Sequence, residues 1–146
     1  MQPTPITDSL SVAGQITRED IAALAKEGYG TIINNRPDGE EPGQLGHEEA
    51  AAEAAKHGME YHYIPVLTNT ISVRDVVAHQ KAVLRGGHKV LAHCRSGTRS
   101  YLLWAASRAL YDRESALKLV AEGATKGFDL RVLPSLVEKL EAEKAG

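Results

Sequence analysis

The stretch Lys89-Val-Leu-Ala-His-Cys-Arg-Ser-Gly-Thr-Arg-Ser-Tyr-Leu-Leu-Trp104 joins an apolar run to a helical pattern through one short polar loop. The run that ends at Cys94 indicates a buried strand, and the residues from Arg99 to about Tyr111 are apolar nearly all round, which is typical of a helix inside the core. Gly97 allows the loop between them to curl tightly. We therefore predict a strand, a tight loop and a buried helix.

The loop from Cys94 to Arg99 has the chemistry of an anion-binding site. Backbone N–H groups at a helix N-terminus, together with the positive end of the helix dipole, favour a bound anion. A lone cysteine is more often a small buried hydrophobe, but a cysteine at a helix N-terminus beside cations ionises readily. We predict that Cys94 is a thiolate nucleophile. The predicted anion-binding residues are Arg95, Ser96, Gly97, Thr98 and Arg99.

The rest of the chain alternates strand and helix patterns, which predicts an α/β domain over residues 1–146. We expect a central, mostly parallel sheet of four to five strands with helices on both faces. The predicted strands are 10–13, 31–35, 61–66 and 89–93. The predicted helices are 17–27, 45–57, one from Ser72 to Gly86-Gly87, 99–111, 115–122 and 130–143.

Polar residues follow two of these strands. Ligands of parallel sheets bind at the carboxyl ends of the strands, so we expect these residues to lie near the 94–99 loop. Turn formation or a solvated charge is the alternative explanation for each of them. The candidates are Asn35, Arg36, Asp38, Glu40, Glu41, Thr68, Asn69 and Thr70.

Composition excludes several classes of protein. The 17 basic and 19 acidic residues give a net charge of −2, so we expect neither nucleic acid nor a membrane as partner. The single cysteine excludes an intrachain disulfide and indicates a reducing, cytoplasmic setting, and the amino end lacks a secretion-signal pattern. The six histidines show no paired ligand spacing, so we predict no metal site and no cofactor.

The motif His-Cys-x-x-Gly-x-Arg-Ser at 93–100 resembles the phosphate-binding loop of cysteine-dependent tyrosine and dual-specificity phosphatases. The segments 12–15, 32–41, 63–66 and 127–130 extend the similarity to the bacterial phosphatase-like domain of beta-lactamase-hydrolase-like proteins. This resemblance implies a cysteine-phosphatase-like fold and hydrolysis through a phosphocysteine at Cys94. It implies that Arg99 grips the oxyanion with two nitrogens, that Ser100 assists the leaving thiolate and that His93 tunes the cysteine. Asn35 and Arg36 are predicted to support the site.

Two features depart from the phosphatase pattern. The residues between Cys94 and Arg99 are one fewer than in tyrosine and dual-specificity phosphatases. Those enzymes also carry a general-acid aspartate where this chain has Leu67-Thr-Asn-Thr70. We therefore predict Asp38 as the acid, with Glu41 or Asp75 as the alternatives.

Both departures are normal in rhodanese sulfurtransferases, whose loops have this length and whose persulfide chemistry needs no acid. The upstream segments, by contrast, are phosphatase-like. We predict a cysteine-dependent phosphatase-like hydrolase, with sulfur transfer through a Cys94 persulfide as the alternative and a non-catalytic anion-binding module as a third reading. The expected partner is a small molecule bearing phosphate, sulfate or sulfane sulfur, or a phosphoprotein.

Overall fold

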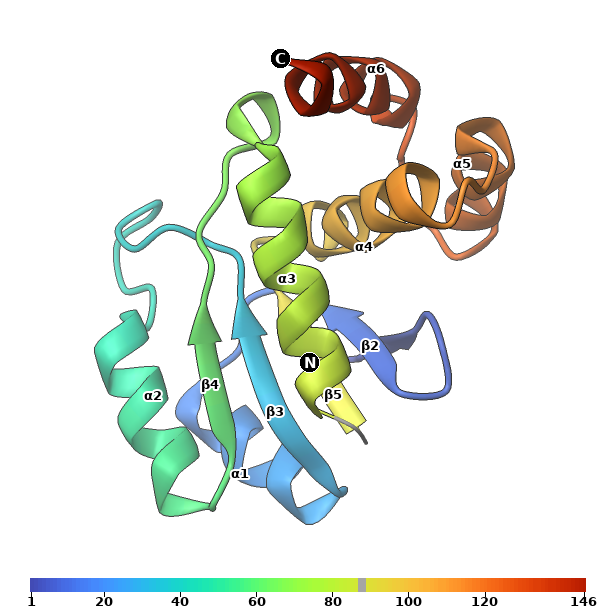
Figure 1. The fold of residues 1–146 in the computed structure, drawn as a ribbon. Coiled ribbons are helices and arrows are strands. Elements are labelled where there is room, and N and C mark those ends of the chain that lie inside the picture. Colours follow the sequence, from blue (N-terminus) through green and yellow to red (C-terminus); the bar gives the residue numbers. More distant parts are fainter. Residues whose placement is uncertain (87–88) are drawn as a thin grey trace.

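Short apolar strands form the centre of a five-stranded sheet in the computed structural model, which describes residues 1–86 and 89–146 (Figure 1). Strands β2 (Leu10–Ala13), β5 (Lys89–His93), β3 (Tyr29–Asn34) and β4 (Glu60–Tyr63) lie in this order and pair in parallel. Strand β1 (Thr4–Pro5) pairs antiparallel with β2 at one edge. The prediction of a mostly parallel sheet of four to five strands is confirmed.

Helices cover both faces of the sheet, as predicted (Figure 1). Helices α1 (Arg18–Lys26) and α2 (His47–Lys56) lie on one face. Helices α3 (Val73–Gly86) and α4 (Thr98–Tyr111) lie on the other, where α5 (Ala116–Thr125) and α6 (Leu133–Ala145) pack against α4.

The strands separate two hydrophobic cores because successive side chains point to opposite faces. Ile32 and Leu91 belong to the core under α1 and α2, whereas Ile33 and Val90 belong to the core under α3 and α4. Each of these four side chains is completely buried. The buried helix predicted after the loop is α4, which contributes Leu102, Leu103 and their neighbours to the larger core.

Local signals explain where most elements begin and end. Thr17 caps α1 in a capping box with Asp20, as the sequence indicates. Strand β4 ends at Tyr63, three residues before the predicted end, although the backbone N–H groups of Ile64 and Val66 still bond to the carbonyls of Asn34 and Asn35.

The helix bounds also differ from the predicted ones. Helix α2 begins two residues late and α6 three residues late, and α5 runs on to Thr125. The segment between α5 and α6 is consequently a loop, and it contacts the 94–99 loop. Part of the predicted helix end at Gly86-Gly87 lies outside the described residues.

Among the described residues, no helix is long and apolar enough to cross a membrane.

Candidate active site

The 94–99 loop lies at the carboxyl end of β5, directly before α4. The Cys94 side chain is 1% exposed, and its Sγ accepts a hydrogen bond of 3.1 Å from the backbone N–H of Gly97. Gly97 has a φ of +97°, a conformation that side chains disfavour. The loop therefore aims a backbone donor at the sulfur, as an anion-binding loop requires.

Two other segments hold the loop closely. A Cβ on Gly97 would lie 2.9 Å from Cε1 of Phe128, so Phe128 packs directly against the loop. The carbonyl oxygen of Arg95 also accepts a hydrogen bond of 3.3 Å from the backbone N–H of Gln15. A Cβ on Gly14 would lie 2.9 Å from that same oxygen. Glycine at positions 14 and 97 thus permits the close contact of three chain segments.

Arg99 reaches back across the site to a carboxylate. Its Nη1 donates to Oε2 of Glu40 at 2.8 Å and to the carbonyl oxygen of Val66 at 2.9 Å, and its Nη2 donates to Oε1 of Glu40 at 2.8 Å. The bonds to Glu40 raise the pKa of Arg99 above its ordinary value, and the Cys94 sulfur adds a smaller effect in the same direction. Arg99 is therefore a fixed cation beside the sulfur.

Glu40 lies between two guanidinium groups. Besides both bonds from Arg99, its Oε1 accepts a hydrogen bond of 2.8 Å from Nε of Arg36. The hydrogen bonds from Arg99 are the main cause that lowers the pKa of Glu40 to about 2. Glu40 was one of several polar candidates in the sequence, and the structure shows that it is the carboxylate that bonds to the 94–99 loop.

Arg36 is completely buried beneath Glu40. Its Nη1 donates to Oε1 of Gln15 at 3.1 Å and its Nη2 donates to Oε1 of Glu41 at 3.2 Å. The backbone N–H of Arg36 donates to Oδ1 of Asn34 at 2.8 Å. Arg36 therefore links β3, Gln15 after β2 and the two acidic residues, and its charge is compensated within the site.

Asn35 joins the strand ends to the start of α4. Its backbone N–H donates to the carbonyl of His93 at 2.8 Å, and its Nδ2 donates to the carbonyl of Ile64 at 2.9 Å. Its Oδ1 accepts the hydroxyl proton of Ser100 at 2.8 Å. The structure thus brings Asn35 and Ser100 together at the base of the loop, with the Ser100 hydroxyl donated to Asn35 in this conformation.

His93 is buried under the loop with 1% exposure. Neither of its ring nitrogens has a hydrogen-bond partner among the described residues. Burial lowers the pKa of His93 to about 4, so the ring is neutral at physiological pH. His93 adjoins Cys94 without adding a positive charge to the site.

Asp38 lies on α2. Its Oδ1 accepts a hydrogen bond of 2.9 Å from the backbone N–H of His47, and its Oδ2 bonds Nδ1 of the same residue. The backbone N–H of Asp38 donates to the hydroxyl of Tyr63, whose ring stacks on His47 at 3.9 Å. These contacts orient the Asp38 carboxylate toward the start of α2.

The other predicted polar residues lie in two segments, the loop after β4 and the 94–99 loop itself. Thr68, Asn69 and Thr70 form a short 3-10 helix, η1 (Thr68–Thr70), and the nearby contact with Arg99 comes from the carbonyl of Val66 instead. The hydroxyls of Ser96 and Thr98 lie 3.2 Å apart. Arg95 and Ser96 are exposed, as residues at the mouth of a site would be.

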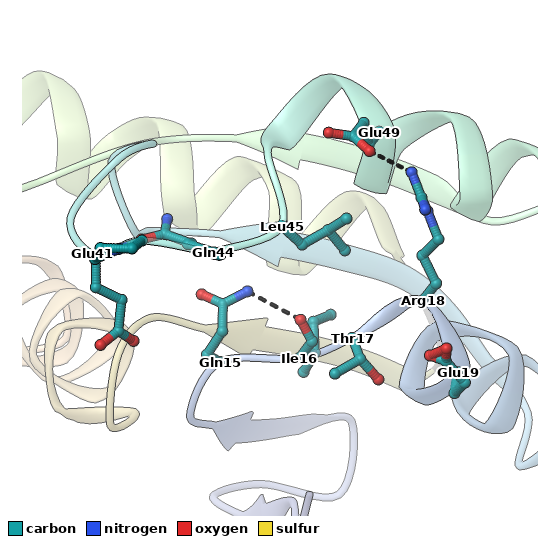
Figure 2. A pocket seen from close by; sticks show the side chains of 11 residues that line it. Gln15, Ile16, Thr17, Arg18, Glu19, Glu41, Gln44, Leu45 and Glu49 are labelled. Atoms are coloured by element: carbon teal, nitrogen blue, oxygen red, sulfur yellow. Dashed lines mark hydrogen bonds and ion pairs between the residues drawn. The ribbon is translucent and has the colours of Figure 1, made fainter.

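A recess of about 470 Å³ adjoins the site (Figure 2). Gln15 and Glu41 line it on the side of the 94–99 loop, Leu45 lies across from Gln15, and an ion pair between Arg18 and Glu49 lies at the far end. Within the part of the chain that the structure describes, no group of His, Cys, Asp and Glu could hold a metal ion.

The fold and the buried cysteine loop define a cysteine-phosphatase-like protein. The profile of the family described as "Beta-lactamase hydrolase-like protein, phosphatase-like domain" matches residues 4–111, and the chain belongs to this family. This confirms the predicted family.

Relatives of known name support the assignment. The chain is 38% identical over 130 residues to a beta-lactamase hydrolase-like protein of Xylella fastidiosa, which covers 89% of this chain and 30% of that protein. It is 37% identical over 142 residues to a protein of the same name from Agrobacterium fabrum, covering 97% and 33%. The chain thus spans about a third of the length of these relatives.

Solved structures agree on the fold. A candidate phosphatase from Neisseria meningitidis superimposes with a TM-score of 0.82 at 28% identity, covering 93% of this chain and 96% of that one. The phosphatase Tk-PTP in its active form superimposes with a TM-score of 0.73 at 20% identity, covering 94% and 96%, which shows the fold alone. The predicted cysteine-phosphatase-like fold is confirmed.

Proposed function

We propose that the chain is a cysteine-dependent phosphatase-like hydrolase in which Cys94 attacks a phosphoester seated in the 94–99 loop. The observation that carries the proposal is the 3.1 Å hydrogen bond from the Gly97 N–H to the Cys94 sulfur. A donor at that distance stabilises a thiolate before attack and an oxygen anion during it, because it needs no reorganisation. The family and the fold support the same chemistry.

The reaction has two steps. In the first, the Cys94 thiolate attacks phosphorus, the S–P bond forms and the P–O bond breaks, and the leaving oxygen takes the bonding electron pair. In the second, water attacks phosphorus, the S–P bond breaks, and the thiolate and inorganic phosphate are released. Arg99 compensates the negative charge that the phosphoryl oxygens carry in both steps.

Sulfur transfer is the second candidate function for two reasons. The residues between Cys94 and Arg99 are one fewer than in tyrosine phosphatases. In addition, the candidate acid Asp38 bonds His47, and sulfur transfer needs no acid. In this reaction the thiolate attacks the outer sulfur of thiosulfate, the S–S bond breaks and sulfite leaves with the electron pair. The Cys94 persulfide then passes its outer sulfur to cyanide or a thiol, and the Cys94 thiolate returns. No oxygen atom needs a proton in this sequence.

One pair of assays on the purified chain tests both proposals. The substrates are 4-nitrophenyl phosphate in one assay and thiosulfate with cyanide in the other, each with the wild type and Cys94→Ser. We expect wild-type phosphate release that falls to the blank rate in Cys94→Ser, whose fold is checked by its melting temperature. Unchanged hydrolysis by Cys94→Ser would contradict the nucleophile, and thiocyanate formation alone would favour sulfur transfer. Anion binding without turnover in either assay would favour the third hypothesis, a non-catalytic anion-binding module.

A further inference from the structure

We infer that the site supplies no proton to the leaving group, so that its substrates are phosphoesters and anhydrides whose leaving group is stable as an anion. This inference rests on the proposed hydrolase function and names its substrate class. Aryl phosphates with electron-withdrawing groups, acyl phosphates and phosphoanhydrides belong to the class, and phosphate esters of ordinary alcohols do not.

The need for a proton depends on the leaving group. An alkoxide is strongly basic, so breaking its P–O bond requires simultaneous protonation, to which a positioned acid typically contributes about 10²–10⁴-fold. A phenolate with an electron-withdrawing group, a carboxylate or a phosphate departs as an anion and is protonated later by water. The presence or absence of an acid at the site therefore selects between these substrates.

Asp38 is the general acid that the sequence predicts, but its hydrogen bonds direct its carboxylate toward α2. Its Oδ1 accepts a hydrogen bond from the backbone N–H of His47, and its Oδ2 is hydrogen-bonded to Nδ1 of the same ring. These two bonds hold the carboxylate at the N-terminus of α2, where unpaired backbone N–H groups favour an acceptor. The stack of His47 on Tyr63 of β4 holds this arrangement at the first residue of α2.

Glu40 lies at the 94–99 loop but is bound as an anion. Both of its oxygens accept from Arg99, and Oε1 also accepts from the buried Arg36. A carboxylate in this position carries no proton to donate at neutral pH, since its pKa is lowered to about 2.

The remaining carboxylates around the site are also engaged. Glu41 accepts from Arg36, and Asp75 accepts from the backbone and hydroxyl of Ser72. Asp129, which follows Phe128 on the loop against Gly97, accepts from Nε and Nη2 of Arg131.

The loop after β4 offers no substitute acid. Residues 66–70 are Val-Leu-Thr-Asn-Thr, none of which is ionisable in the physiological range. The nearby Lys139 donates its ammonium protons to the carbonyls of Asn69 and Ile71, at 3.2 and 3.4 Å. The segment that would carry an acid thus contributes a carbonyl, that of Val66, to Arg99.

The test compares kcat/KM for 4-nitrophenyl phosphate and phenyl phosphate, which differ mainly in the basicity of the leaving oxygen. Without an acid, phenyl phosphate is expected to react about 10²–10⁴-fold more slowly, the range that a positioned acid would otherwise recover. The pH profile for phenyl phosphate is expected to rise and then level off up to about pH 9, because no group on the protein must stay protonated.

Asp38→Asn supplies the matched variant. Asparagine keeps an oxygen for the His47 N–H, so the fold is preserved, and the ratio of the two kcat/KM values should stay as in the wild type. Comparable rates for the two esters in the wild type, or a ratio that grows in Asp38→Asn, would overturn the inference while leaving the hydrolase intact. Absence of Cys94-dependent hydrolysis of 4-nitrophenyl phosphate would remove the proposed function itself, and the inference with it.

Discussion

Glu40 binds both terminal nitrogens of Arg99, at 2.8 Å each, and with the same carboxylate holds the buried Arg36. The residue that should grip the substrate anion is thus positioned by an acidic side chain from the loop after β3. Nε of Arg99 takes no part in these bonds. The arrangement fixes Arg99 beside Cys94 before any substrate arrives.

Glu40→Gln should destabilise the fold because it leaves the completely buried Arg36 without its closest anion. Removing one partner of a buried ion pair costs at least about 3 kcal/mol. We therefore expect the unfolding free energy, measured by denaturant titration, to fall by about 3 kcal/mol. Glu41→Gln is the control, since Glu41 is about half exposed and its pair is worth less than about 1 kcal/mol. Equal losses in the two variants would contradict this role of Glu40.

Arg99→Lys should reduce turnover much more than Arg95→Lys. A lysine cannot make the paired bonds that Arg99 makes with Glu40 and cannot present a planar fork to an anion. We expect kcat to fall by about 10²–10³-fold, as for loss of one oxyanion donor. Arg95 is exposed at the mouth, and its replacement by lysine keeps the charge. Steady-state kinetics with 4-nitrophenyl phosphate measure both, and equal losses would mean that the roles are assigned to the wrong arginine.

Gly97→Ala should distort the loop for two reasons. The φ of +97° strains any side chain, and the new Cβ would lie 2.9 Å from Phe128. Gly43→Ala isolates the first effect, since Gly43 has a φ of +81° and open space around its Cβ position. Thermal unfolding should show a loss of about 1–2 kcal/mol for Gly43→Ala and a larger one for Gly97→Ala. Only Gly97→Ala should also abolish turnover, and full activity in that variant would contradict the proposed loop geometry.

Acid should destabilise the fold through its buried histidines. Burial lowers the pKa of His79 and of His93 from 6.5 to about 4. Between these pH values the two rings are protonated in the unfolded chain but remain neutral in the native protein. The unfolding free energy should therefore fall between pH 6.5 and 4, by at most about 1.4 kcal/mol per pH unit for each ring.

His79→Leu tests this dependence without touching the site. Both ring nitrogens of His79 lack partners among the described residues, so leucine removes a desolvation cost and keeps most of the volume. The variant should be at least as stable at pH 7 and should lose less stability than the wild type by pH 4, measured by urea titration. An identical pH slope in the two proteins would disprove the contribution of His79.

The sequence predicted the elements whose signals are local. The strand 89–93 agrees with the structure to the residue because an apolar run before Cys94 leaves few alternatives, and Thr17, where the predicted helix 17–27 starts, is the N-cap of α1. The two-residue strand β1 was missed, since Thr4-Pro5 carries no periodic pattern and gains its order by pairing with β2.

The site was predictable only in part. The 94–99 loop follows from its spacing, but the partners of the polar residues depend on contacts between loops far apart in the sequence. Asp38 and Glu40 stand two positions apart in one acidic turn, and their sequence gives no reason why one bonds α2 and the other Arg99. The difference arises because the turn places Glu40 between two arginines from separate elements.

The central claim is that Cys94 forms the covalent intermediate of a phosphoryl transfer. The most direct measurement is intact-mass and peptide mass spectrometry of the chain after rapid acid quenching from 4-nitrophenyl phosphate, with a parallel sample mixed with thiosulfate. We predict that one phosphoryl group is added to the peptide containing Cys94 and that the corresponding peptide of Cys94→Ser stays unmodified. A protein that stays unmodified by the phosphate ester but gains one sulfur atom on Cys94 from thiosulfate would contradict it.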